Sequence, residues 1–463
     1  MLLLCGFAQA QGDYGAARLV RAEAVLRLQH ADPIVRGEAA LVVAAGADAS
    51  SQATIVAMTT DPEPPARLRA IVALGLLAIP ASAAAFDQLL ADPQSRVEPE
   101  GVAAAFALGI MPPDRAASIT SRVLASFLHA SWKRQREVVL ALLLGMAQND
   151  QSGQAASLRR LFDDESNRDP EVRAELLLLL LPVDRTFDGK LMRRLLERGS
   201  DEERATLLQW LATNHSAFDT EVLPNLERIA GNGLVPEQRA TALAALTRMH
   251  HVPALALAAR ALASSHPAEN AQGMRSMLSL GGATMRVALE RHLREEPDPA
   301  RKAALLANYD APLSTDLADL CARLAADALQ PLALRTAAAT TLARSAPTRA
   351  IPLLRDLFRS TPHRSSLGSL AAALLRAEPE PPPLERLLDG PPDLRQHPER
   401  WEALLGAGHP EATRVVLLSL ESSRSSVEHM AMALGVWRRC MVLGLPRSPC
   451  AATPAVLRKV LGG

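Results

Sequence analysis

The chain reads Asp169-Pro170-Glu171-Val172-Arg173-Ala174-Glu175 and then continues with six leucines, Leu176–Leu181. A second stretch, Asp32-Pro33-Ile34-Val35-Arg36, has the same order of residue types and also leads into an apolar run. Aspartate before proline is typical of a helix start. The carboxylate caps free amides, and proline lacks the N–H group that a first turn cannot use. Both stretches therefore predict a helix that begins at the proline.

Weaker copies of this pattern recur at a regular step along the chain. Prolines stand at positions 33, 62 and 93 and again at 236, 267, 299, 331 and 362, so the step is 29 to 32 residues. Trp132, Pro170 and Asp201 mark less regular units between the two runs. A step of this length is typical of stacked two-helix repeats. The predicted fold is all-α, a right-handed α-α superhelix of about ten to twelve helix pairs.

The Asp-Pro-x-Val-Arg order, the alanine-rich helices and the step of ~31 residues resemble HEAT repeats, in particular the bacterial type shared with phycocyanobilin lyase subunits. The resemblance covers roughly residues 30–375 and is strongest at Asp32–Ala45 and Asp169–Leu181. It implies a HEAT-like solenoid of antiparallel helix pairs. By itself it implies no enzyme activity, because one fold hosts many functions.

A basic residue stands four positions after three of the capping aspartates. An acid four residues before a base is the favourable order for an ion pair along one helix. We expect three such pairs: Asp32–Arg36, Asp169–Arg173 and Asp298–Lys302.

The chain changes character after the predicted solenoid, which spans residues 12–376. Residues 377–401 are rich in proline and in acidic side chains, and prolines at this density interrupt helices. Residues 402–463 restart a helical repeat and end in a stretch that has no acidic residue after Glu428. This basic end is predicted to be a solvated capping surface, and docking of an anionic partner or of the acidic segment itself is the alternative.

Residues 1–11 resemble the end of a truncated secretory signal. A short apolar stretch precedes Ala8-Gln9-Ala10, which matches a signal cleavage site, but no positive residue comes first. This interpretation predicts a periplasmic or exported protein in which Cys440 and Cys450 could form a disulfide. The alternative is the hydrophobic start of a first helix in a cytoplasmic protein with two reduced thiols.

Charge and composition weigh against several classes of partner. Fifty basic residues balance fifty acidic ones, which removes the bulk attraction of a nucleic-acid or anionic-membrane binder. Aromatic residues make up 3% of the chain, too few for base-stacking platforms. No segment has the ~20 strongly apolar residues of a membrane span. A protein or peptide partner is expected, whereas the oligomeric state is not predicted.

No catalytic, cofactor-binding or metal-binding residue is predicted. Gly189-Lys190 lacks the rest of a phosphate-binding loop, and the cysteines lack zinc spacing. The remaining clusters are interpreted as structural. His250-His251 is predicted to be a helix-end pair, and Asp163-Asp164-Glu165 and Glu295-Glu296 are predicted to be solvated acids. The patch Trp132-Lys133-Arg134-Gln135-Arg136 is too short to indicate nucleic acid, and the core residues are predicted to include Trp132, Trp210, Trp401 and Trp437.

The sequence therefore predicts a non-catalytic scaffold for protein–protein interaction. An enzyme on the same fold, such as a bilin-lyase-like protein, is the alternative. The protein-binding residues cannot be assigned, because sequence does not show which helix of each pair lines a groove. Arg36 and Arg173 are not candidates, since each is expected to pair with its own capping aspartate. An open groove would favour the scaffold, and an enclosed pocket of converging His, Asp, Glu or Cys side chains would favour the enzyme.

Overall fold

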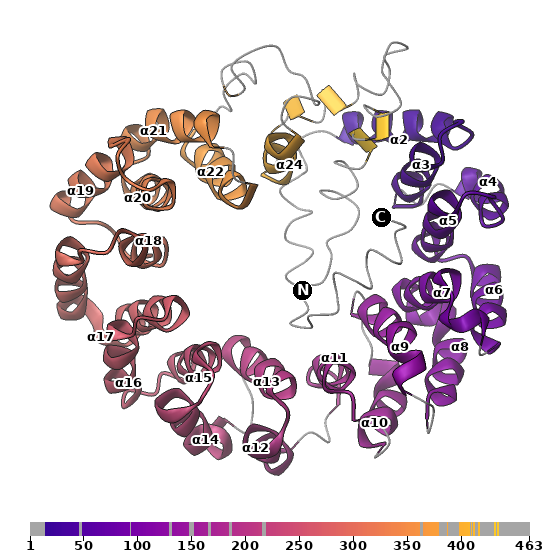
Figure 1. The fold of residues 1–463 in the computed structure, drawn as a ribbon, viewed down its shortest axis with the longest axis horizontal. Coiled ribbons are helices and arrows are strands. Elements are labelled where there is room, and N and C mark those ends of the chain that lie inside the picture. The colour runs from indigo at the N-terminus through magenta and orange to yellow at the C-terminus, as the bar shows by residue number, and fades with distance from the viewer. Residues whose placement is uncertain are drawn as a thin grey trace. The chain divides into compact units, whose positions relative to one another are not determined.

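The structure is a computed structural model, and it describes the chain in ranges with gaps between them. The described residues are 14–45, 49–92, 94–128, 132–147, 152–164, 168–184, 188–214, 219–361, 364–378, 387, 398–407, 409, 411–412, 415–416, 430–431 and 433–434. Every regular element in these ranges is a helix (Figure 1), which confirms the predicted all-α class. None of these helices is long and apolar enough to cross a lipid bilayer.

Several predictions fall on residues outside the described ranges. They concern the signal-like segment 1–11, the Cys440–Cys450 pair, Trp437, and most of the ranges 377–401 and 402–463.

The chain divides into two compact units, which are described separately. Unit 1 comprises Met1–Asp188, Gly199–Thr206 and Thr413–Gly463, and unit 2 comprises Gly189–Arg198 and Leu207–Ala412.

Unit 1 is built from two rows of helices. One row packs in chain order, α3 on α5, α5 on α7, α7 on α9 and α9 on α11, and the other places α6 on α8 and α8 on α10 (Figure 1). Its elements are α2 (Tyr14–Arg27), α3 (Pro33–Ala45), η1 (Ala49–Ser51), α4 (Gln52–Met58), α5 (Pro64–Leu77), α6 (Pro80–Ala91), η2 (Ser95–Val97), α7 (Pro99–Ile110), α8 (Pro113–Ser126), α9 (Trp132–Met146), η3 (Ser152–Gln154), α10 (Ala155–Asp163) and α11 (Pro170–Leu180).

The first row of unit 1 packs closely because glycines face the neighbouring backbone. A Cβ atom at Gly75 of α5 would lie 2.5 Å from the carbonyl oxygen of Ala107 in α7. One at Gly109 of α7 would lie 2.4 Å from the carbonyl oxygen of Leu142 in α9. Any larger side chain at these two positions would force the helices apart.

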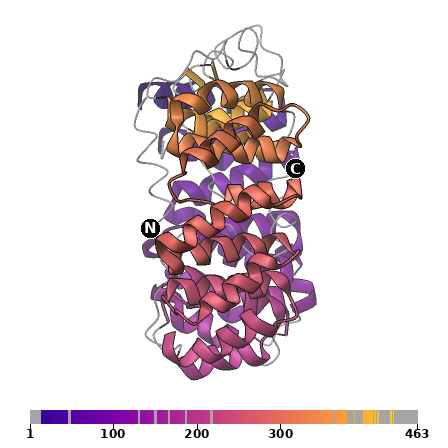
Figure 2. The same ribbon diagram turned by 90° about the vertical axis from the view of Figure 1, so that its left-hand side faces the viewer.

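Unit 2 repeats the two-row arrangement. Helices α18, α20 and α22 pack in one row and α19 and α21 in the other, and Figure 2 shows the helices of this unit lying across the view in successive levels. The elements after α11 are α12 (Gly189–Arg198), α13 (Asp201–Thr213), α14 (Asp219–Asn232), α15 (Pro236–Arg248), α16 (Ala254–Ala263), α17 (Pro267–Glu295), α18 (Pro299–Ala307), α19 (Thr315–Ala326), α20 (Leu332–Ser345), α21 (Pro347–Ser360), α22 (Arg364–Ala377) and α24 (Pro398–Gly406).

Helix α17 is two helices joined at a break. Gly282 has φ 64° and ψ −157°, a conformation essentially restricted to glycine, so the helical path is interrupted there. With its two halves counted as one pair, ten successive pairs run from α3 to α21 in the described residues. This number agrees with the predicted number of about ten to twelve helix pairs.

Three helices begin as the sequence predicts. Helices α3, α11 and α18 start at the proline of their Asp-Pro pair. The carboxylates of Asp32, Asp169 and Asp298 each accept two hydrogen bonds from first-turn amides, at 2.9 to 3.3 Å. The weaker copy at Asp61-Pro62 differs, because α5 begins two residues later, at Pro64.

The predicted ion pairs within single helices are wrong. The capping carboxylates are turned towards backbone amides, and the basic side chains extend elsewhere. Arg36 forms a forked pair with Asp61 of the next repeat, with Nε and Nη2 each 3.0 Å from a carboxylate oxygen. Arg173 reaches Glu203 at 2.8 Å, and Lys302 Nζ lies 3.5 Å from the carbonyl oxygen of Arg294.

The arginines of α3, α5, α11 and α15 form an inter-repeat ladder. Side chains on a helix tilt towards its N-terminus, so an arginine in the first turn passes over the preceding loop and reaches the adjacent repeat. Each ladder arginine joins its own helix to a carboxylate 25 to 33 residues further along the chain. The four pairs are Arg36–Asp61, Arg67–Glu100, Arg173–Glu203 and Arg239–Glu269.

Candidate binding cleft

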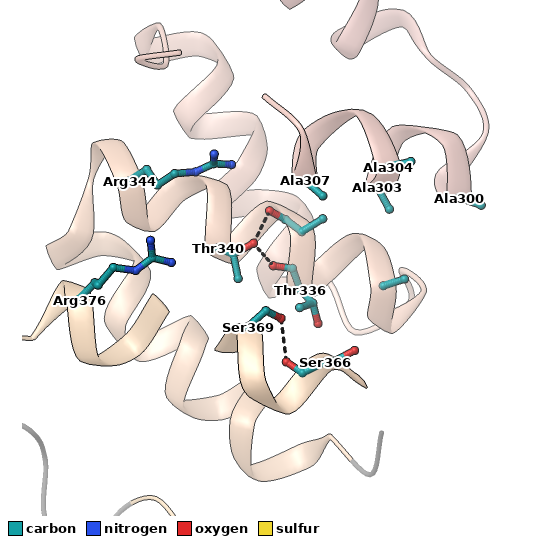
Figure 3. Close-up of a pocket in the computed structure, with 12 residues that line it drawn as sticks. Ala300, Ala303, Ala304, Ala307, Thr336, Thr340, Arg344, Ser366, Ser369 and Arg376 are labelled. Atoms are coloured by element: carbon teal, nitrogen blue, oxygen red, sulfur yellow. Dashed lines mark hydrogen bonds between the residues drawn. The ribbon is translucent and has the colours of Figure 1, made fainter. Parts of the chain in front are cut away.

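An open cleft crosses the row α18, α20 and α22 in unit 2 (Figure 3). Its volume is about 540 Å³, within the range of ligand-binding pockets. Twelve residues line it: Ala300, Ala303, Ala304, Ala307, Ala333, Thr336, Ala337, Thr340, Arg344, Ser366, Ser369 and Arg376.

The cleft exists because each of the three helices turns a face of small side chains towards it. On α18 the alanines at 300, 303, 304 and 307 have the spacing of one helical face. On α20 the residues at 333, 336, 337, 340 and 344 follow the same spacing. The sequence contains this signal. It could not be assigned to a cleft, however, because small side chains also pack between helices, as in unit 1.

Two arginines occupy one end of the cleft. Arg344 comes from α20 and Arg376 from α22, and Figure 3 shows both guanidinium groups extending towards the same side. Arg344 Nη2 donates to the Thr341 hydroxyl at 3.1 Å, and Arg376 Nε donates to the carbonyl oxygen of Ala372 at 3.0 Å. Among the described residues, neither arginine has a carboxylate within ion-pair distance.

The two guanidinium groups influence each other. Desolvation lowers the pKa of Arg344 below its ordinary value; Asp310 opposes this effect and Arg376 adds to it. Arginine stays charged at neutral pH all the same. Two positive charges therefore lie at one end of the cleft, and the negative charge of Asp310 acts on one of them, Arg344.

The hydroxyl groups of Thr340 and Ser369 can accept hydrogen bonds from a ligand in the cleft, because each already donates its own proton to a backbone carbonyl. Thr340 Oγ1 donates to the carbonyl oxygens of Thr336 and Ala337 at 2.9 and 3.1 Å, and Ser369 Oγ donates to that of Ser366 at 2.9 Å. A hydroxyl that donates to its own helix keeps lone pairs for an incoming donor. Thr336 is 7% exposed, and its Oγ1 has no hydrogen-bond partner within the described ranges.

His250 and His251 form a helix end, as predicted. His250 follows the C-cap of α15 with φ 52°, and its amide donates to the carbonyl oxygen of Thr247. The sequence did not indicate a partner for His251. The structure places His251 Nε2 2.6 Å from Glu227 of α14, a contact between helices that spacing within one helix cannot reveal.

The structure does not bring the carboxylates of the two acidic clusters, 163–165 and 295–296, into one site, and their described members differ in burial. Asp163 is exposed and pairs with Arg159 at 2.7 Å, whereas Asp164 is buried and Glu165 lies outside the described residues. Glu295 is exposed, but Glu296 is buried and receives the Asp298 amide at 3.1 Å, so the prediction of solvated acids is wrong for Asp164 and Glu296.

The tryptophans and the basic patch are only partly described. Trp401 is fully buried, as predicted for a core residue, and Trp210 is half-buried on α13. The side chains at 132–134 are not among those described, and Arg136 pairs with Asp169 at 2.9 Å. In the part of the chain that the structure covers, no group of three or more His, Cys, Asp or Glu side chains could hold a metal ion.

One buried acid has a strongly shifted pKa. Burial, with a smaller contribution from Glu171, raises the pKa of Glu175 in α11 to about 7. Shifted acids often mark functional sites. Glu175 is 1% exposed and belongs to the core face of α11, however, so it is accessible to no substrate.

Comparison with known proteins gives little further information. No protein-family model matches the chain, and no curated protein matches it. Among solved structures, a crystal structure of a Kap121p mutant is similar over 94% of this chain and 54% of that one, with 13% sequence identity and a TM-score of 0.33. The chain thus spans about half the length of that protein. A similarity at this level carries no argument about function, so the helical repeat fold rests on the structure itself.

Proposed function

We propose that the protein is a non-catalytic binding scaffold that holds a protein or peptide in the cleft of α18, α20 and α22. The observation that carries this proposal is the lining of the cleft, which combines small apolar side chains, hydroxyl groups and two arginines. Mixed polar and apolar linings on helical repeats suit polypeptide ligands.

The same lining argues against catalysis in the cleft. Its twelve residues include no His, Asp, Glu, Cys, Lys or Tyr that could serve as a general acid or base. The Ser369 and Thr340 hydroxyls donate to backbone carbonyls and have no base beside them that would activate a nucleophile. A bilin-lyase-like enzyme is the rival proposal, and it rests on the resemblance of the repeats alone.

The test is affinity purification from the native host with a blocked cleft. Ala333 and Ser369 are exposed and line the cleft, so the double variant Ala333→Trp/Ser369→Trp should fill it without disturbing the core. Ala259→Trp, on the exposed side of α16, is the matched control. We expect a protein partner with the wild type and the control but not with the double variant.

Two results would contradict the proposal. One is a partner that binds the blocked and unblocked proteins equally, which would leave a scaffold but place its binding site outside the cleft. The other is recovery of a stoichiometric chromophore or metal ion in place of a protein, which would favour the enzyme.

A further inference from the structure

The arginines at the end of the cleft differ from those of the inter-repeat ladder. Each ladder arginine meets a carboxylate of the neighbouring repeat, as Arg239 meets Glu269. Arg344 and Arg376 instead donate to uncharged groups at 3.0 to 3.4 Å. Asp310 acts on Arg344 from beyond ion-pair distance, so neither guanidinium group holds a carboxylate of the described residues, and an anion between the two would be attracted to both.

We propose that the cleft binds an acidic peptide in extended conformation, with a carboxylate held between Arg344 and Arg376. This inference rests on the proposed function and adds the chemistry of the ligand. A guanidinium is a planar fork that matches the two oxygens of a carboxylate, so two such groups at one end of a cleft form a recognition site for Asp, Glu or a chain terminus.

The floor of the cleft suits the main chain of a peptide. Peptide N–H groups are donors, and the Ser369 and Thr340 hydroxyls offer lone pairs in the cleft. The alanines between these residues let a backbone approach closely.

The span of the cleft sets the length of the ligand. Helix axes in contact lie about 8–10 Å apart, so the row from α18 to α22 spans roughly 20 Å. An extended chain advances about 3.3–3.6 Å per residue, so about six residues cover that distance.

A nucleic acid fits the same cleft less well. The lining holds no aromatic side chain on which a base could stack, and only two cations. A phosphodiester backbone has acceptors but no N–H donors to meet the hydroxyl oxygens. The observations therefore favour a peptide.

The experiment is a selection of random heptapeptides, displayed on phage, against the full chain. Enriched peptides are synthesised with a fluorescein label, and binding is measured by fluorescence anisotropy. We expect enrichment of Asp and Glu, and about tenfold weaker binding when Arg344→Gln or Arg376→Gln removes one charged donor. Arg349→Gln is the control, because Arg349 is half-exposed on α21 and pairs with Asp319 outside the cleft. Circular dichroism checks that each variant is folded.

The outcomes separate this inference from the proposed function. If the selected peptides are neutral or basic but fail to bind Ala333→Trp/Ser369→Trp, the cleft binds peptides and the carboxylate assignment is wrong. If no peptide is enriched, the acidic-peptide inference fails, and the affinity purification alone decides the proposed function. If the blocked cleft changes nothing, both proposals fail. A random-sequence RNA hexamer that binds more tightly than every selected peptide would replace the acidic peptide with a nucleic acid.

Discussion

At the scale of single residues, each ladder arginine makes two kinds of contact at once. Arg36 Nη1 donates to the carbonyl oxygens of His30 and Ala31, both at 2.7 Å, while Nε and Nη2 hold Asp61. It thereby closes the loop before its own helix and joins the next repeat. A lysine ammonium could not make these contacts together, because it lacks the planar fork.

We expect a double-mutant cycle of Arg36→Gln and Asp61→Asn in urea unfolding to give a coupling energy of about 1 kcal/mol at pH 7. Burial opposes ionisation of Asp61, but hydrogen bonds from Arg36 and the Glu63 amide outweigh it and hold the pKa of Asp61 below its ordinary 3.8. The coupling should therefore be complete above pH 3.8 and decline as the pH falls through the lower, folded-state pKa. A coupling that persists unchanged in strong acid would contradict the ion pair.

Glu175 provides a second residue-scale prediction. Its folded-state pKa of about 7 lies above the ordinary 4.5, so folding favours the protonated acid. Stability from this group is complete below pH 4.5 and declines up to about pH 7, by on the order of 3 kcal/mol. We expect Glu175→Gln to remove that decline, apart from a constant offset. Parallel curves of unfolding free energy against pH for the two proteins would refute the buried acid.

At the scale of elements, helix starts were predictable where the signal is local. Asp32, Asp169 and Asp298 cap their helices through amides two and three residues away, which sequence alone specifies. The break inside α17 was not predicted, because Gly281-Gly282 lies in an otherwise helical pattern. The ion-pair partners predicted for Arg36 and Arg173 are wrong, because a carboxylate 25 or 30 residues away competes successfully with the one four residues away.

The break in α17 should be sensitive to substitution. We expect Gly282→Ala to lower the free energy of unfolding by about 1–3 kcal/mol, because alanine is strained at φ 64°. Gly368→Ala is the matched control. Gly368 lies inside α22 with nothing within 4 Å of an added Cβ, so that change should stabilise the protein by up to about 1 kcal/mol. Equal changes in melting temperature for the two variants would mean that alanine is not strained at position 282.

At the scale of the whole molecule, packing within each unit connects neighbours in the chain. Helix α9 contacts α7 and α11, and α20 contacts α18 and α22. This order of contacts follows from the repeat pattern, and the sequence predicted it. The repeat pattern did not predict the binding cleft, because the lining of the cleft depends on which faces of α18, α20 and α22 remain uncovered.

A core truncation should therefore act locally. Leu177 is fully buried in α11, whereas Leu178 beside it is only half-buried. We expect Leu177→Ala to lower the free energy of unfolding by about 2–5 kcal/mol. The variant should lose amide protection first in α9 and α11. Protection in α18, α20 and α22 should stay at the wild-type level in hydrogen exchange followed by mass spectrometry. A uniform loss across both units would contradict neighbour-limited cooperativity.

The inter-repeat ladder bears on how such a chain can change its length. The repeat that contains α5 presents Arg67 to Glu100 of the next repeat and Asp61 to Arg36 of the previous one. A tandem copy of this repeat would bring both groups with it, so the copied arginine would meet the copied carboxylate. Duplication of this whole repeat therefore preserves the ion pairs at its junctions, whereas a partial insertion breaks one. The same ion pairs that stabilise the stack at this repeat make it a unit that gene duplication can copy.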